Sequence, residues 1–392
     1  MVWPQFSKNE IKLVTRILKS GKVNYWTGEY GRKLENSFSK LVGKRYSLAI
    51  SNATIGLEYS LKTLNLKNTD EVLVTPRSYF SSASCILKVN AKPVFCDVEI
   101  ESQNISIDSI KSNISKNTKA IIIVHLGGNV ADIGEIKKIA KKRNIILIED
   151  CSQAHGAKYK GKNVGSFGDI AIWSFCNDKI ISSGGEGGMI CLNDKKIYDE
   201  LWSYRDIGKN REKFLKIKSK YYFQWLHDNI GSNFRMTELQ SALALSQLKN
   251  LDQTIKRRKS IADAFINSIK KISWLKYFKD DDIYSSARYR LNISIDQKIV
   301  KGNFYAKNVI NKLNKNILIC NEGPCPLIFL EKGFGDKIYK ANNLKNSYHL
   351  ANNNISLFID PTMTKKEVKK IVNEFTKVMQ YFSKKINFEY EQ

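Results

Sequence analysis

The chain has 392 residues, of which 42% are hydrophobic and 26% charged, a composition typical of a folded protein rather than a disordered one. That length suits one large domain with a smaller one beside it. The net charge of +26 raises the question of nucleic-acid binding, but the lysines are spread along the whole chain without a zinc-finger or RNP-type motif. Solvated, lysine-rich helix faces are the better interpretation, and we expect no nucleic-acid partner.

The sequence carries no targeting or membrane signal that we recognise. Its N-terminus lacks the charged-then-apolar pattern of a signal peptide, and no apolar run is long enough to cross a bilayer. The seven cysteines are odd in number, form no CxxC pair, and mostly lie inside apolar runs. We therefore expect small buried thiols rather than disulfides or a metal site, no membrane partner, and a cytoplasmic location.

Hydrophobic periodicity predicts alternating strands and helices through the larger, N-terminal part of the chain. Residues 120–124 form an apolar run without alternation, which is typical of a central strand buried on both faces. The pattern predicts a mostly parallel α/β sheet. Strands are expected at 46–50, 71–75, 92–97, 120–124, 145–148, 170–173 and 189–192, and helices at 8–20, 31–42, 55–64, from about 80, 133–142 and 196–204.

The remainder of the chain is predicted to form a smaller α+β unit. A long amphipathic helix is expected from Thr237 to about residue 269, with Glu238 on its polar side. We place a domain boundary within that helix, which gives domains of residues 1–255 and 256–392. Further elements are strands at 288–295 and 355–359, a helix at 302–313, and a last helix that a capping box opens at 364–367 and that runs to about residue 384.

Polar residues follow several of the predicted parallel strands, and such sheets place ligands beyond the carboxyl ends of their strands. These strand ends carry residues 51–54, 78–79, His125, Asp150 and 174–179. The first of these groups also opens a helix, whose free N–H groups and positive dipole end suit a phosphate. The convergence predicts a ligand site at one edge of the sheet.

Lys179 and Asp150 are the strongest chemical candidates. Lys179 follows a buried strand and precedes the glycine-rich turn 184–188, where small residues let the backbone approach a ligand. A lysine held there can lose its proton and form a Schiff base. Asp150 would pair with the protonated ring nitrogen of pyridoxal 5'-phosphate (PLP). The alternatives are an ordinary surface charge for Lys179 and a turn cap for Asp150.

Other positions are weaker candidates on their own. Gln153 could donate to the phenolic oxygen of the cofactor, and Tyr79 could stack on its ring, although an aromatic residue after a strand is more often part of the core. Thr54 and Ser174 offer hydroxyl groups for a phosphate, but such residues also commonly cap helices. For His155 we prefer a core histidine whose hydrogen bonds are satisfied.

Familiar nucleotide and metal motifs are missing from the sequence. The turn at 184–188 lacks G-x-G-x-x-G and precedes a strand, so it is no dinucleotide fingerprint. No P-loop, HExxH or GxSxG motif occurs, and four histidines leave little room for metal chemistry. We expect no metal site.

Blocks spread over nearly the whole chain are similar to those of one known family. The most specific are 149–157 (EDCSQAHGA), 164–169 (VGSFGD), 174–180 (SFCNDKI) and 184–188 (GGEGG), and similar blocks in the family's order are 23–28, 75–79, 231–238 and 358–362. Together they resemble the DegT/DnrJ/EryC1/StrS family of PLP-dependent nucleotide-sugar aminotransferases. The resemblance implies the PLP-dependent transferase fold of type I, with helices on both faces of the central sheet.

The resemblance also implies a role for each candidate residue. Lys179 would bind PLP covalently and then move a proton between two carbons, and Asp150 would pair with the ring nitrogen. Asn233 would reach the cofactor phosphate of the neighbouring subunit in a homodimer. Gln153 would donate a hydrogen bond to the phenolic oxygen, and Tyr79 would stack on the ring. The phosphate would be held by Thr54, by the backbone of Ala53 and by Ser174.

A family member would take an amino group from L-glutamate and pass it to a nucleotide-linked keto-deoxysugar for O-antigen, capsule or similar glycan synthesis. We expect a 4-keto-6-deoxy sugar, with a 3-keto sugar as the alternative. Lys179 argues against the branch of the family that has histidine there and performs dehydration. Ala53 replaces the usual glycine, and residues 129–130 also differ from the family pattern. A PLP-bound but idle regulatory protein is the rival from another class.

Overall fold

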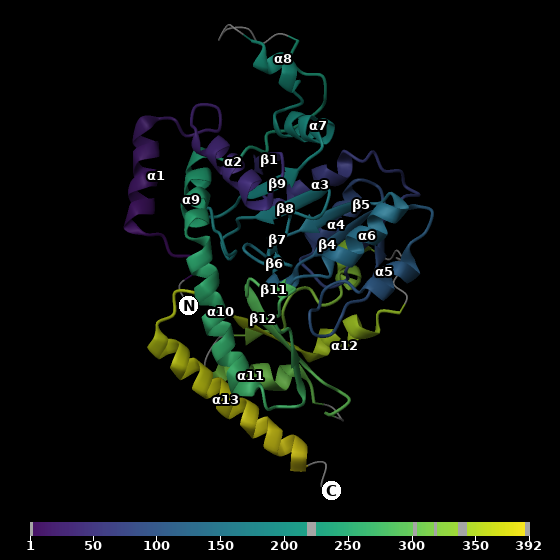
Figure 1. Ribbon diagram of the computed structural model, residues 1–392, viewed down its shortest axis with the longest axis vertical. Helices are drawn as coiled ribbons and strands as arrows, with labels where there is room; N and C mark the ends of the chain where they lie inside the picture. Colours follow the sequence, from purple (N-terminus) through teal and green to yellow (C-terminus); the bar gives the residue numbers. More distant parts are fainter. Residues whose placement is uncertain (1–2, 218–224, 301–303, 317–319, 336–342, 389–392) are drawn as a thin grey trace.

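The computed structural model describes residues 3–217, 225–300, 304–316, 320–335 and 343–388 (Figure 1). Its centre is a seven-stranded sheet in the order β1-β9-β8-β5-β4-β2-β3. β9 runs antiparallel to both β1 and β8, and the other neighbours pair in parallel. The strands are β1 (Tyr46–Ile50), β2 (Glu71–Val74), β3 (Lys92–Phe95), β4 (Thr118–Val124), β5 (Ile146–Asp150), β8 (Ile170–Ser174) and β9 (Gly188–Leu192).

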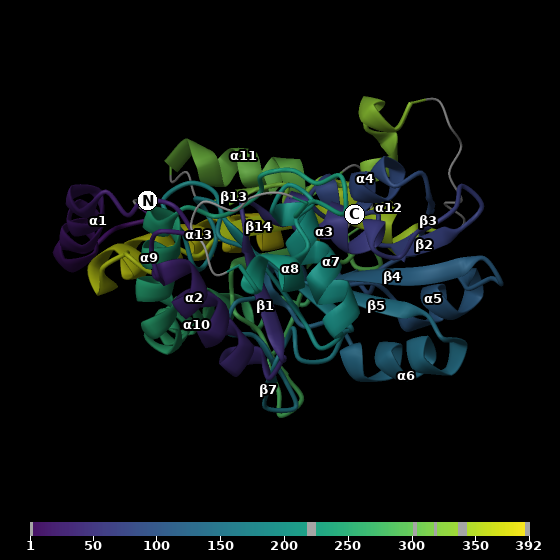
Figure 2. The same cartoon turned by 90° about the horizontal axis from the view of Figure 1, so that it is seen from above.

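Helices cover both faces of this sheet because its strands are apolar on both sides. In β4, Ile121 and Ile123 join one hydrophobic core, whereas Ala120 and Ile122 join the other. Figure 2 shows α4 and α6 on opposite sides of β4 and β5. The helices of this part are α1 (Lys8–Ser20), α2 (Tyr30–Val42), α3 (Ala53–Lys62), α4 (Ser81–Lys88), α5 (Ile107–Asn113), α6 (Ile133–Arg143), α7 (Lys195–Arg205) and α8 (Arg211–Leu215).

A second, antiparallel sheet lies in the C-terminal part, in the order β10-β12-β14-β13. Its apolar face packs in a separate core with the helices at the bottom of Figure 1. The expected fold class, a mostly parallel sheet covered on both faces with a smaller α+β part, is confirmed. The elements are α10 (Leu251–Ile269), β10 (Leu275–Tyr277), β12 (Arg290–Ile295), α11 (Ala306–Asn316), β13 (Cys320–Asn321), α12 (Lys345–Asn353), β14 (Asn354–Phe358) and α13 (Lys365–Phe388).

The two parts are joined by shared elements. In α10, Ile255 belongs to a core of the central sheet and Ile261 to the C-terminal core. Ile328 and Phe334 return to pack beside α3 and α4. A small sheet of β6 (Lys158–Tyr159), β7 (Lys162–Asn163) and β11 (Tyr284–Ser285) also links them. The division into residues 1–255 and 256–392 stays a prediction.

The long helix expected from Thr237 is in fact two helices. α9 (Glu238–Lys249) ends and α10 begins at Asn250, which has φ −100° and ψ 8°. Asparagine is a poor helix former because its side chain competes for backbone hydrogen bonds. The break lets α9 pack against α1 and α2 while α10 turns to α13.

Glu238 was expected on a polar helix face, and that expectation was wrong. The residue is only 1% exposed, and its Oε2 accepts a hydrogen bond from the backbone N–H of Gly31 at 3.2 Å. The same carboxylate accepts from the N–H groups of Glu29 and Tyr30, so it caps α2, whose own N-cap side chain makes no capping hydrogen bond. Gly28 makes room for it, since a Cβ there would lie 2.0 Å from the carboxyl carbon.

The capping box at Thr364 is confirmed, because its hydroxyl accepts from Glu367 N at 3.2 Å while Glu367 accepts from Thr364 N at 2.7 Å.

Within the ranges described, we find no helix both long and apolar enough to span a membrane.

Candidate active site

A cavity of about 590 Å³ lies at the carboxyl ends of the parallel strands. The residues expected to contact the cofactor all line it except Asn233, whereas His125 and His155 do not. The C-terminal part supplies the facing wall through Tyr289, Arg290, Asn292 and Ser356. The site is therefore built from both parts of the chain.

One end of the cavity is suited to a phosphate. Asn52 caps α3 by accepting from Ile55 N at 3.0 Å, and no described residue accepts from the N–H groups of Ala53 or Thr54. Unpaired N–H groups at a helix N-terminus attract anions. The hydroxyl-bearing Ser174 borders the same cavity. Ala53 begins α3 and does not have the positive φ that would require glycine, so this departure from the family leaves the backbone site intact.

Asp150 is a buried carboxylate without a cation. It is 5% exposed and accepts from Ser82 Oγ and Ser152 N, both at 3.1 Å. No basic side chain among the described residues lies within ion-pair distance of it. A buried carboxylate is costly unless a positive group meets it. The bond to Ser152 N matches the turn-cap interpretation, and the missing cation matches the ring-nitrogen interpretation.

Gln153 and Tyr79 both line the cavity. The Oε1 of Gln153 accepts from Gly127 N at 2.7 Å, which leaves the amide NH₂ group free to donate to a ligand in the cavity. Tyr79 is 68% exposed, so the alternative of a core aromatic residue does not apply. An exposed ring at the edge of a cavity can stack on an aromatic ligand.

Lys179 reaches into the cavity and meets two oxygen atoms. Its Nζ lies 3.2 Å from the Tyr289 hydroxyl and 3.3 Å from Asp178 Oδ1, and its side chain is 16% exposed. Burial lowers the pKa of Lys179, but the neighbouring Tyr289 and Asp178 outweigh burial, so the pKa is raised. The Tyr289 hydroxyl also donates to Asp178. Without a ligand, the amine is held as an ammonium group.

Sequence reasoning missed Tyr289 and Asp178. Asp178 stands next to Lys179 and could have been weighed as its partner. Tyr289 is 110 residues away from Lys179, and no local pattern marks it. The position of Tyr289 depends on Gly128, because a Cβ at that glycine would come within 3.0 Å of the backbone nitrogen of Tyr289. The glycines of the His125-Leu-Gly-Gly motif thus let the C-terminal part approach the site.

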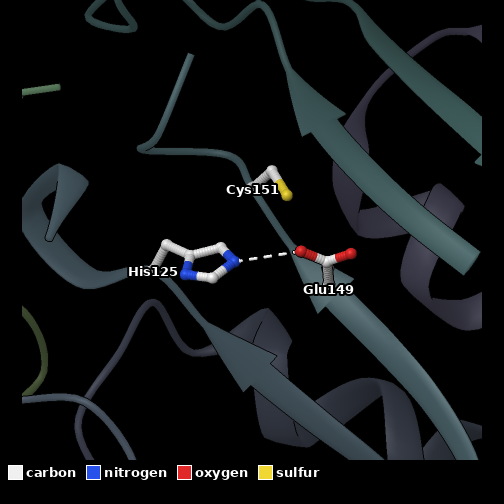
Figure 3. Close-up of side chains that lie close together, drawn as sticks. All are labelled: His125, Glu149 and Cys151. Carbon is white, nitrogen blue, oxygen red and sulfur yellow. Dashed lines mark hydrogen bonds and ion pairs between the residues drawn. The ribbon is translucent and has the colours of Figure 1, made fainter. Parts of the chain in front are cut away.

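Beneath the cavity, His125, Glu149 and Cys151 lie close together (Figure 3). His125 Nδ1 accepts from Ala131 N at 3.1 Å, so the proton is on Nε2, which donates to Glu149 at 3.3 Å. Burial raises the pKa of Glu149, but His125 and backbone N–H groups outweigh it, so the pKa is lowered. Those N–H groups belong to Gly165, Phe167 and Gly168. The side-chain donors and acceptors of His125 and Glu149 are thus already paired, and we assign the cluster a structural role.

His155 differs from the expectation of a satisfied core histidine. It is fully buried, but neither ring nitrogen has a hydrogen-bond partner among the described residues. Its ring lies against Trp173 and Phe175, with centroids 5.1 Å and 5.8 Å away. Burial lowers the pKa of His155 to about 3, so the ring is neutral. It acts as a packing residue.

The cysteines follow the expectation only in part. Cys176 and Cys325 are half-buried and line the cavity. Burial raises the pKa of both thiols, which favours their neutral form. The buried ones are Cys85, Cys96, Cys151, Cys191 and Cys320.

Comparison with known proteins identifies the family. The DegT/DnrJ/EryC1/StrS aminotransferase family matches residues 4–376. The chain belongs to this family. It is 37% identical to GDP-perosamine synthase of Escherichia coli O157:H7 over 69% of this chain and 71% of that protein.

Solved structures agree with this assignment. An aminotransferase from Psychrobacter cryohalolentis superposes with a TM-score of 0.92 at 34% identity, covering 97% of this chain and 99% of that one. An E. coli GDP-4-keto-6-deoxy-D-mannose-3-dehydratase with bound hydrated PLP gives a TM-score of 0.84 at 26% identity. The match covers 95% of this chain and 97% of that one. The chain is a PLP-dependent aminotransferase of the expected fold, and the free N–H groups of α3 and the unpaired Asp150 fit that cofactor.

The pairing of Lys179 with Asp178 gives a testable consequence. In Asp178→Asn the carboxylate that favours the ammonium form is lost, while burial, which favours the neutral amine, remains. The pKa of Lys179 should fall, so the neutral amine that attacks the PLP aldehyde becomes available at lower pH. We expect the pH profile of PLP capture by the cofactor-free protein, followed by absorbance, to move to lower pH.

The control is Glu186→Gln, which removes a negative charge from the same cavity wall at a residue that forms no ion pair or hydrogen bond with Lys179. It should leave the profile in place. If Asp178→Asn gives the wild-type profile, Asp178 does not set the protonation of Lys179.

Proposed function

We propose that the protein transfers an amino group from L-glutamate to a nucleotide-linked 4-keto-6-deoxy sugar in glycan synthesis. The observation that carries the proposal is the single cavity in which Lys179, the cation-free Asp150 and the free N–H groups of α3 meet. Membership of an aminotransferase family supports the reaction type. The perosamine synthase relative supports the sugar class, with a guanosine diphosphate sugar as the first substrate to test.

PLP, when bound, stores the amino group between two half-reactions and withdraws electrons from the reacting carbon. Asp150 would keep the ring nitrogen protonated, Gln153 would donate to the phenolic oxygen, and Tyr79 would cover the ring. Lys179 Nζ would take the proton from the α-carbon of glutamate and deliver it to the cofactor carbon that carries the amino group, and in the second half-reaction it would move a proton from that carbon to the sugar carbon. Ala53, Thr54 and Ser174 would hold the phosphate.

Tyr289 and Asp178 would position the reacting amine. The Tyr289 hydroxyl contacts both Lys179 Nζ and the Asp178 carboxylate, so the three groups are held together. Lys179 must be neutral before it acts as a base. Because Asp178 and Tyr289 favour the ammonium form of the free amine, their role would be to hold Nζ in reach of the substrate carbon.

We also propose a homodimer in which Asn233 reaches the partner's cofactor phosphate. Asn233 is exposed and lies outside its own chain's cavity, but the backbone around it is fixed. Arg235 binds Asp206 at 2.7 Å, and Ser51 N donates to Phe234 O at 2.8 Å. Exposed apolar residues occur nearby in the sequence, and such residues favour a partner surface: Ile207, Leu215, Trp225 and Ile230.

Mixing two defective chains tests the shared site. Asn233→Ala should weaken PLP binding roughly tenfold, as expected for a lost hydrogen bond to a charged group. Lys179→Ala should lose the covalent bond. In mixed dimers, one site has both residues intact, so wild-type PLP affinity should return at those sites. Absence of recovery, or a monomer in analytical ultracentrifugation, would contradict the proposal.

The substrate is tested by incubating the PLP-loaded protein with L-glutamate and nucleotide-linked keto sugars, with products read by mass spectrometry. We expect amination of a 4-keto-6-deoxy sugar and none by Lys179→Ala. Amination of only the 3-keto sugar would overturn the ring position. If glutamate fails to convert the bound cofactor at all, the protein is the idle, regulatory alternative.

A further inference from the structure

Two hydrogen bonds hold the backbone of Lys179. The residue lies between β8 and β9 in a stretch, residues 175–187, that forms neither a helix nor a strand. Its N–H donates to Cys176 O at 3.0 Å, a bond within the same turn. Its carbonyl oxygen accepts from the indole N–H of Trp3 at 2.8 Å, and no other donor in the described part of the chain reaches that oxygen. The bond from Trp3 therefore ties this backbone to a distant segment.

The C-terminal part of the chain fixes Trp3 in turn. The backbone N–H of Trp3 donates to Asp360 Oδ2 at 3.4 Å, in the loop after β14. The Arg258 guanidinium of α10 lies over the indole, 5.4 Å from the ring centroid, and Arg258 Nη1 donates to Ile359 O at 2.5 Å. A cation over an aromatic face is attracted to it. The indole is thus held on two sides while its N–H contacts Lys179.

The other end of Lys179 also meets the C-terminal part. Nζ lies 3.2 Å from the hydroxyl of Tyr289, which directly precedes β12. A lysine side chain is a flexible four-carbon stem, so the place of its amine depends on a fixed backbone. Trp3 at the carbonyl and Tyr289 at Nζ hold the two ends of one residue against the same part of the molecule.

We propose that Trp3 is a positioning residue for Lys179, whose backbone it fixes so that Nζ reaches the cofactor. This inference rests on the proposed function, because it takes Lys179 as the lysine that bonds to PLP. A small displacement of a reacting group costs rate more than affinity. A tryptophan that only anchored the N-terminal segment would change stability and leave the protonation of Lys179 as it is.

The groups around Lys179 decide what a displacement would change. Burial lowers the pKa of Lys179, but Tyr289 and Asp178 outweigh burial and raise it. If Nζ moves away from these two oxygens, burial remains and the pKa falls. His155, whose pKa burial lowers to about 3, stays neutral throughout. The titratable and charged groups that face Lys179 or its partners are Asp178, Tyr289, His155, Arg258 and Arg290.

The first experiment follows PLP capture by the cofactor-free protein as a function of pH. Trp3→Phe keeps an aromatic ring for Arg258 and removes only the N–H donor. Its pH profile should move to lower pH, because Nζ loses part of its contact with Asp178. In an Asp178→Asn background that carboxylate is already absent, so adding Trp3→Phe should shift the profile less than it does in the wild type. Such non-additivity is expected of residues that act through one contact.

The second experiment measures how fast L-glutamate converts the bound cofactor of the PLP-loaded protein. At saturating glutamate, Trp3→Phe should slow this step roughly tenfold, while KM stays within about twofold. Trp274→Phe is the matched control, because Trp274 also donates an indole hydrogen bond, to Ser383 Oγ at 3.0 Å in the C-terminal core. It should leave the rate and the pH profile unchanged even where it lowers stability.

If Trp3→Phe does not fold, benzothienylalanine at position 3 takes its place, since it has the shape of tryptophan with sulfur instead of the N–H group. An unchanged pH profile or an unchanged rate in a folded variant would overturn the positioning role. A shift of full size in the Asp178→Asn background would overturn it as well. Covalent capture of PLP by Lys179→Ala would instead overturn the proposed function, so the two failures are distinguishable.

Discussion

Two adjacent carboxylates at the end of β5 organise the site. Side chains alternate along a strand, so Glu149 and Asp150 point to opposite faces of the sheet. Glu149 is satisfied by His125 and by backbone N–H groups of residues 165–168. Asp150 has two hydrogen bonds and no cation. One carboxylate thus anchors the strand end, and we propose that the other is left for a positively charged ligand, the PLP ring nitrogen.

A buried ion pair elsewhere in the chain shows what Asp150 lacks. Arg205 meets Glu35 at 3.0 Å and Asp206 at 2.9 Å, although both the arginine and its partners are buried. Leaving a buried charge without a partner costs about 3–5 kcal/mol. No basic side chain among the described residues pairs with Asp150, and we propose that a protonated ring bound in the cavity supplies the missing partner.

Sequence reasoning located the parts of the site that depend on local order along the chain. Because parallel strands end at one edge, the residues after β1, β2, β5 and β8 had to converge, and Lys179, Asp150 and Thr54 do line one cavity. Tyr289 and Arg290 depend on how the C-terminal part meets Gly127 and Gly128, a tertiary contact without a local signature. Glu238 was misjudged for the same reason, since the helix it caps lies far away in the sequence.

The central claim is that Lys179 bonds to PLP in this cavity. Borohydride reduction of the PLP-loaded protein, followed by peptide mass spectrometry, tests it most directly because reduction makes that bond permanent. The account predicts a phosphopyridoxyl group on Lys179, and none after Lys179→Ala. A modification on another lysine, with Lys179 unmodified, would contradict it.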